Sequence, residues 1–127
     1  MTKRSEHVEQ REFVQWWRRT YPDHWIFAIP NGGHRTPATA LKLKLEGVSP
    51  GVPDLFVPTI NLFIEMKAEG GRLSEAQEDW IFYLMSRGLR VIVGYGFEDA
   101  KEKVLTLGEA LAAEIGLFEI PPDAPIN

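Results

Sequence analysis

Two acidic residues and a lysine, held in two short apolar segments, form the best candidate for chemistry in this sequence. The segments DLFVP (54–58) and NLFIEMK (61–67) predict an antiparallel hairpin that turns at residues 58–61. In that register Asp54 lies opposite Glu65, and strand alternation puts Lys67 on the face of Glu65 and Met66 on the core face. Directly opposed like charges are destabilising. A divalent cation between the carboxylates would offset the repulsion, and Lys67 could orient or deprotonate a bound water.

The same three charges could instead form a surface ion cluster, and a shift of one residue in the register would separate them. The flanking apolar residues favour a functional interpretation, because Asp and Glu are rarely left inside strands without a partner or a metal. The chain has no cysteine and its three histidines lack zinc-ligand spacing, so thiolate and zinc sites are excluded. Oxygen-ligated Mg²⁺, Mn²⁺ or Ca²⁺ is therefore the expected metal.

The elements expected around this hairpin alternate between helix and strand. Apolar spacing, capping residues and short β-branched runs predict them. In chain order they are a helix over 5–20, a strand over 24–30, a helix over 37–47, the hairpin, a helix over 75–87, a buried strand over 89–95, and one or two helices over 97–116. This order predicts an α/β fold with a mixed sheet. Four tryptophans lie on apolar faces and are expected in the core rather than as base-stacking platforms: Trp16, Trp17, Trp25 and Trp80.

Length and composition restrict the class of protein. The 127 residues, 44% apolar and 25% charged, predict one domain over 1–127 with a flexible tail at about 119–127. No apolar run is long enough to cross a membrane, and the charged start lacks the apolar region of a signal peptide. We therefore expect a cytoplasmic protein with no membrane partner.

The segments around the hairpin resemble a known family. GVPDLFVP followed by LFIEMKAEGGRLSEAQ is similar to the VRR-NUC domain, a branch of the PD-(D/E)xK nuclease superfamily. Pro53-Asp54 matches the first half of its motif and Glu65-Met66-Lys67 the second, and the segments SEHVEQ, IPNGGHR and LRVIVGYG extend the match over roughly residues 5–97. The resemblance implies a restriction-endonuclease-like α/β core, a mixed β-sheet flanked by helices, and hydrolysis of DNA phosphodiesters with Mg²⁺ or Mn²⁺.

The resemblance also implies roles for individual residues. Asp54 and Glu65 would ligate the metal together with the backbone carbonyl of Met66, and Lys67 would position the attacking water. The family suggests a structure-selective endonuclease for branched or junction DNA such as a Holliday junction. It also suggests a homodimer, because this small domain has one active site while a junction has paired scissile strands.

Two further site residues come from the family pattern. Glu6 would be the first-helix acid of the metal site, with Glu9 as second choice, although either could simply favour the positive end of the helix dipole. Gln77 takes the place of the family's helix glutamine and could bind Lys67 or a phosphate. It could equally complete a capping box with Ser74.

Charge is distributed unevenly along the chain. The net charge of −4 argues against a general nucleic-acid coat. Residues 1–50, however, carry eight Lys and Arg against five Asp and Glu, a net charge of +3, which leaves −7 for residues 51–127. The N-terminal half could receive a polyanion, although solvated helix faces explain the split equally well.

Candidate DNA contacts lie in that half, in a loop of small and polar residues and on the helix after it. They are Asn31, Gly32, Gly33, His34, Arg35, Lys42 and Lys44. A merely flexible turn and solvent-exposed lysines are the competing interpretations. Two rival functions also stay open: a catalytically silent DNA-binding module on the nuclease fold, and a partner-binding domain in which the acid pair has no role.

Overall fold

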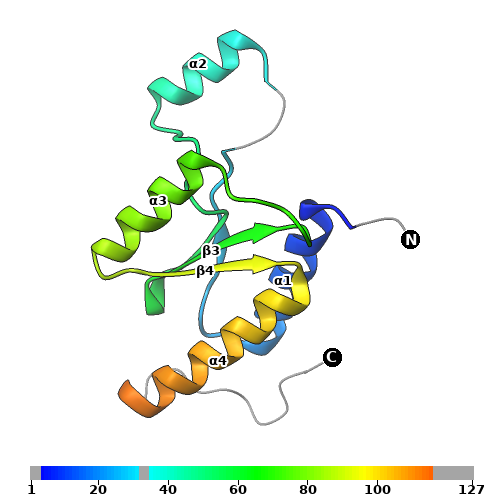
Figure 1. The fold of residues 1–127 in the computed structure, drawn as a ribbon, viewed down its shortest axis with the longest axis vertical. Helices are drawn as coiled ribbons and strands as arrows, with labels where there is room; N and C mark the ends of the chain where they lie inside the picture. The colour runs from blue at the N-terminus through cyan, green and yellow to red at the C-terminus, as the bar shows by residue number, and fades with distance from the viewer. Residues whose placement is uncertain (1–3, 32–34, 116–127) are drawn as a thin grey trace.

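The computed structural model describes residues 4–31 and 35–115 and confirms an α/β fold with a four-stranded mixed sheet (Figure 1). Its elements are α1 (Glu6–Thr20), β1 (Phe27–Ala28), α2 (Pro37–Leu45), β2 (Leu55–Val57), the 3₁₀ turn η1 (Pro58–Ile60), β3 (Leu62–Lys67), α3 (Glu75–Ser86), β4 (Arg90–Tyr95) and α4 (Phe97–Ile115). The expected tail at about 119–127 lies outside the described residues. No helix in the described ranges has the length and apolar character needed to cross a membrane.

The sheet has the order β1-β2-β3-β4, with β1, β2 and β3 antiparallel and β4 parallel to β3. In the β2–β3 hairpin Leu55 pairs with Ile64 and Val57 pairs with Leu62. One step further this register places Asp54 opposite Glu65, so the predicted register is confirmed. The turn itself is a 3₁₀ turn that ends at Asn61, whose φ of 49° is the left-handed conformation that asparagine tolerates.

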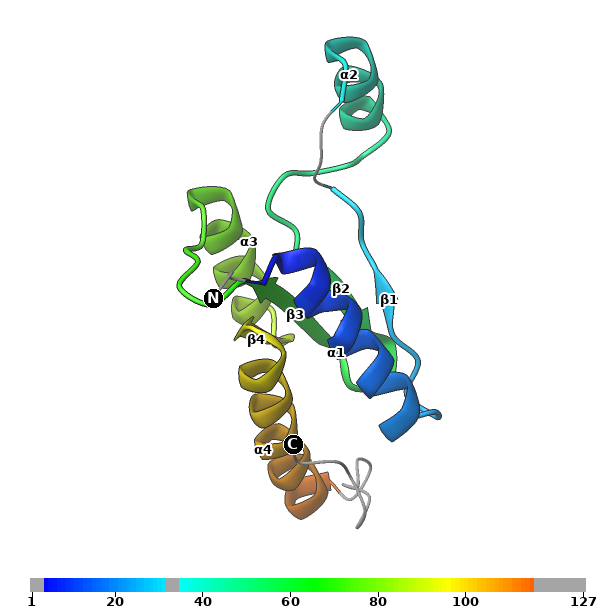
Figure 2. The same cartoon turned by 90° about the vertical axis from the view of Figure 1, so that its right-hand side faces the viewer.

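Helices α1 and α4 cover one face of the sheet and enclose the core (Figure 2). β2 and β3 send alternate side chains to this face, and Leu62, Ile64 and Met66 are fully buried there. The helices contribute apolar side chains that include Phe13, Trp16, Trp17, Ala100 and Val104. The core positions expected for Met66, Trp16 and Trp17 are confirmed.

The opposite face carries Glu65 and Lys67, and helix α3 covers it only in part. Beyond the reach of α3, Phe27, Phe56 and Phe63 form a row across three strands, with ring centroids 5.9 and 4.4 Å apart. All three rings stay partly exposed. The acidic pair therefore lies between a helix and an open apolar surface.

Three expectations about the elements are wrong. The strand expected over 24–30 shrinks to Phe27–Ala28 at the edge of the sheet. None of the described helices covers Trp25, which is 79% exposed instead of buried. The strand expected to be buried at 89–95 is β4, which is the other edge in the described residues and has mostly half-buried side chains.

Helix α2 differs from the other helices in having no core of its own. It begins at Pro37 after the cap Thr36, as the sequence predicts, but none of its residues is buried. Figures 1 and 2 show it projecting away from the sheet as an arm. Asn31 closes the base of this arm, because its side-chain amide donates to the carbonyls of Ser49 (3.3 Å) and Val52 (2.8 Å).

Candidate active site

The centre of the candidate site is a pair of carboxyl groups at the start of β2 and within β3. Asp54 and Glu65 share a hydrogen bond, and the backbone N–H of Met66 donates to Asp54 Oδ2 at 2.8 Å. Glu65 is 1% exposed although it points to the side of the sheet away from the main core. The hairpin register thus brings two acidic groups together in a place with little water to screen them.

The electrostatics of the pair follow from this placement. Burial raises the pKa of Glu65 to about 8, and the charge of Asp54 and its hydrogen bond with Glu65 act in the same direction. Burial also raises the pKa of Asp54, against the lowering effect of the Met66 N–H. Two like carboxyls this close share a proton at neutral pH, because both cannot ionise without a counter-charge.

Lys67 and Gln77 complete the immediate surroundings of Glu65. Lys67 is 8% exposed, and its positive charge lowers the pKa values of both carboxyls. Gln77 Nε2 donates to Glu65 Oε2 at 3.1 Å. The same glutamine completes the capping box with Ser74 at the start of α3, which confirms that interpretation. Its partner in the site is Glu65, whereas the expected bond was to Lys67 or a phosphate.

Backbone contacts hold the site from three sides. The carbonyl of Asp54 accepts from Ile29 N–H at 2.7 Å, which ties β1 to the start of β2. The carbonyl of Lys67 accepts from Gly96 N–H at 2.8 Å, which ties the end of β3 to the start of α4. At Gly51, φ is +91° and a Cβ would lie 2.5 Å from the backbone of Ala76, so only glycine lets the loop before Asp54 approach α3 this closely.

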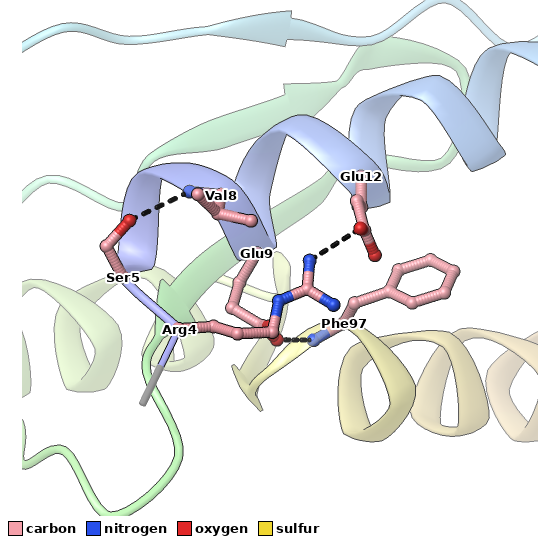
Figure 3. Close-up of polar contacts among 6 residues, drawn as sticks. All are labelled: Arg4, Ser5, Val8, Glu9, Glu12 and Phe97. Atoms are coloured by element: carbon pink, nitrogen blue, oxygen red, sulfur yellow. Dashed lines mark hydrogen bonds and ion pairs between the residues drawn. The ribbon is translucent and has the colours of Figure 1, made fainter. Parts of the chain in front are cut away.

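The two glutamates proposed for the first helix have different roles. Glu6 is exposed, and its charge raises the pKa of Glu65, so its carboxylate lies within electrostatic reach of the pair. Glu9 instead turns toward α4, where its carboxylate accepts from the N–H of Phe97 (Figure 3). Of the two, Glu6 fits the first-helix acid of a metal site, and its ligand role stays a prediction.

The contact between Glu9 and α4 does not follow from the pattern of the first helix, although the residue before α4 gives a signal for it. Helix α4 begins after Gly96, which has no side chain to cap the helix, so the cap must come from elsewhere. Glu9 supplies it and also binds Arg4 Nε at 2.7 Å, while a second nitrogen of Arg4 binds Glu12 at 2.6 Å (Figure 3). A Cβ at Gly96 would lie 2.8 Å from Glu9.

The donor set at the pair fits a hard divalent cation. Two carboxylates and the nearby main-chain carbonyl of Met66 are the oxygen ligands that Mg²⁺ or Mn²⁺ takes, and a bound cation would remove the repulsion that keeps a proton on Glu65. Within residues 4–31 and 35–115 no three Asp, Glu or His side chains gather closely enough to hold a metal ion. Such a cation would therefore keep several waters, as Mg²⁺ normally does.

The residues expected to contact DNA do not gather at the acid pair. Asn31 is engaged at the base of the arm, and Arg35 is half-buried just before α2. Lys42 and Lys44 are exposed on α2, as expected. Gly32, Gly33 and His34 lie outside the described residues.

Comparison with known proteins agrees with this geometry. The family model of the VRR-NUC domain matches residues 1–98, which include every element from α1 to β4. A solved structure described as a "VRR_NUC domain protein" is similar with a TM-score of 0.65 at 23% identity, covering 98% of this chain and 99% of that one. No curated protein matches the chain. The match to the family model over most of the chain shows that the chain belongs to the VRR-NUC domain family.

Proposed function

We propose that the protein is a metal-dependent DNA endonuclease whose single divalent cation binds between Asp54 and Glu65. The buried pair of carboxyls, with the pKa of Glu65 raised to about 8, is the observation that carries the proposal. A group with a strongly raised pKa beside a lysine is the arrangement expected at a functional site rather than in an ordinary strand. When bound, the cation, Mg²⁺ or Mn²⁺, polarises the scissile phosphodiester and makes a bound water more acidic.

The protein residues have separate tasks in this proposal. Asp54, Glu65 and the carbonyl of Met66 hold the cation, and Glu6 adds negative charge from the first turn of α1. Lys67, on the same face as Glu65, positions the attacking water. Gln77 fixes the orientation of Glu65 through its 3.1 Å hydrogen bond.

Branched or junction DNA is the proposed substrate, and a homodimer the proposed functional form. One chain has one acid pair, whereas a junction presents two scissile strands, so two copies are needed for paired cuts. Helix α2 supports a second copy, because Leu41 and Leu45, one helical turn apart, are 58% and 78% exposed on an arm without a core. Sedimentation equilibrium of the full chain tests the dimer. The cytoplasm, expected from the sequence, stays a prediction.

The test of the nuclease is a panel of end-labelled duplex, flap, splayed-arm and four-way DNA, incubated with the protein and Mg²⁺, Mn²⁺ or EDTA. We expect metal-dependent cuts, most rapid on branched substrates. Calorimetry with Mn²⁺ separates the rival functions. A silent DNA-binding module would bind Mn²⁺ and DNA without cutting, and a domain with no role for the pair would not bind Mn²⁺ tightly.

A further inference from the structure

A groove between α1 and β1, outside the acid pair, is a feature that the proposed chemistry leaves unused. The part beside the first turns of α1, here called the near part, has a volume of about 360 Å³ and is lined by residues that include His7, Arg11 and Leu55. The far part of the groove has a volume of about 440 Å³ and extends to Trp25. Arg18 and Phe27 line both parts, so the two form one continuous groove beside α1, where Figure 2 shows β1 running.

The near end of this groove is lined by chain neighbours of candidate site residues. His7 directly follows Glu6, and Leu55 directly follows Asp54, so both of these lining residues are chain neighbours of site residues. From His7 to Arg18 the groove follows eleven residues of helix, a distance of about 16 Å at 1.5 Å per residue. At roughly 3.4 Å per nucleotide of stacked strand, this length holds about five nucleotides.

The charge of the groove is opposite to that of the chain as a whole. The protein has 18 acidic and 14 basic residues, yet no acidic side chain is among the described residues that line either part. The orientation of α1 explains this difference. Glu9 and Glu12 point away to Arg4 and the start of α4 (Figure 3), while Arg11 and Arg18 face β1. The groove thus presents positive charge along α1, from the turn that follows Glu6 towards Trp25.

One exposed aromatic ring, that of Trp25, completes the groove, and the chain around it is held in place. Trp25 is 79% exposed, whereas the ring of Phe27 packs on Phe56 at the other face of the sheet. Next to Trp25, the carbonyl of Ile26 accepts from Arg18 Nη2 at 3.2 Å, and His24 Nδ1 lies 2.7 Å from Thr59 Oγ1. A positively charged groove with a fixed, exposed ring is the combination by which proteins bind single-stranded nucleic acid, since an unpaired base stacks on the ring while cations follow the phosphates.

We propose that this groove binds an unpaired DNA strand of about five nucleotides that runs from the acid pair along α1 to Trp25. This inference rests on the proposed nuclease function and extends it, because it assigns the substrate a single-stranded segment beside the scissile phosphate. A fully paired duplex does not fit the role, since its base faces are hidden in the stack. The exposed position of Trp25 is thereby accounted for.

Binding of fluorescein-labelled DNA, measured by anisotropy in EDTA so that no cutting occurs, tests the proposal. The probes are a splayed-arm DNA with oligo-dT arms and a blunt duplex of equal length. Trp25→Ala and Arg11→Ala should each weaken binding of the splayed-arm DNA about tenfold and of the duplex less than twofold. Arg11→Ala should also lower the slope of log affinity against log salt by about 0.7.

Two control variants match the test variants in exposure. Phe82, on α3, is 78% exposed, and Arg19 is exposed on α1 but does not line the groove. Phe82→Ala and Arg19→Ala should leave binding of the splayed-arm DNA unchanged. Equal losses on both DNAs, or the same losses in the controls, would overturn the proposal.

Two further results separate this proposal from its alternatives. If Trp25→Ala changes the sedimentation mass but not DNA binding, the groove is an interface between copies of the chain, and the proposal is wrong. If the wild type cuts no DNA with Mn²⁺ but Trp25→Ala still weakens binding of the splayed-arm DNA about tenfold, the nuclease proposal fails and the strand-binding groove stands. If the wild type cuts DNA with Mn²⁺ but neither Trp25→Ala nor Arg11→Ala changes DNA binding, the groove proposal is wrong and the nuclease proposal stands.

Discussion

Two buried glutamates in this protein, Glu9 and Glu65, show opposite ways of holding a carboxylate out of water. Glu9, 7% exposed, accepts from the N–H of Phe97 and pairs with Arg4. Glu65, 1% exposed, faces another carboxyl at Asp54, and its pKa is raised to about 8. The first group has its charge compensated by a helix start and a guanidinium, whereas the second lacks full compensation.

The difference separates a structural acid from the acid of the proposed site. A compensated carboxylate such as Glu9 holds two helices together and needs no further partner. An acid pair with raised pKa values is destabilising without more positive charge nearby, and the structure tolerates it between strands that hold it in place. The Glu65 region therefore has the electrostatics of the proposed cation site, whereas the Glu9 region holds α1 against α4.

Asp54→Asn should have the largest effect on the contrast between Glu65 and Glu9, because it removes the like charge beside Glu65. The amide oxygen can still accept from Met66 N–H, so the fold should remain, while metal-dependent cleavage should be abolished for want of a ligand. In EDTA the thermal midpoint should rise, since the repulsion is gone. Gel assays with Mg²⁺ and thermal melts of the same sample check both effects. Full Mg²⁺-dependent activity in this variant would refute the metal assignment.

Lys67→Ala should lower the single-turnover rate by about 10² or more, the scale of a lost positioning group or general base. Mn²⁺ affinity should stay within a few fold, because an ammonium cannot ligate a cation. Lys67→Arg should restore little activity, since guanidinium stays protonated and has a different geometry. Calorimetry gives the Mn²⁺ affinity, and rapid-quench cleavage on the same preparation gives the single-turnover rate. Loss of both together would mean that Lys67 only holds the acid pair in place.

Glu6→Gln and Glu9→Gln, both in α1, should affect different properties: the first metal binding or cleavage, the second stability. Glu9→Gln loses the ion pair with Arg4 and weakens the cap of α4, so we expect the free energy of unfolding to fall by about 1–2 kcal/mol. Its cleavage rate, measured well below the melting temperature, should stay near that of the wild type. Glu6→Gln should leave stability nearly unchanged, since the side chain is exposed, but weaken Mn²⁺ binding or cleavage. If instead Glu6→Gln lowered stability and Glu9→Gln weakened Mn²⁺ binding or cleavage, the roles of the two residues would be exchanged.

The hairpin shows why part of the site could be predicted from sequence. Two short apolar runs around Pro58 and Asn61 set the register, and local alternation then places Asp54, Glu65 and Lys67 on one face without knowledge of the rest of the fold. Gln77 follows in the same way, because the cap at Ser74 sets where α3 begins.

Contacts between distant segments could not be predicted in this way. The bond between Glu9 and Phe97 joins residues 88 positions apart and depends on how α1 packs against α4, which no local pattern encodes. The burial expected for Trp25 was wrong for a related reason. Its apolar character favours the core, but burial depends on whether a helix reaches the edge strand, and here none of the described helices covers it.

The most direct measure of Glu65 itself is the pH dependence of stability in metal-free protein. The folded-state pKa is raised from 4.5 to about 8. Between these values the unfolded chain gives up its proton while the folded chain keeps it, so the unfolded state binds fewer protons and stability falls as pH rises, by at most about 1.4 kcal/mol per unit. Urea unfolding in EDTA from pH 5 to 8, compared with Glu65→Gln as the control, isolates this slope. With saturating Mn²⁺ the slope should disappear, because the cation keeps the pair deprotonated in the folded state, and the unfolded chain is also deprotonated above the ordinary pKa of 4.5. If the wild type and Glu65→Gln have equal slopes in EDTA, Glu65 is already ionised at pH 5, and its distinction from Glu9 disappears.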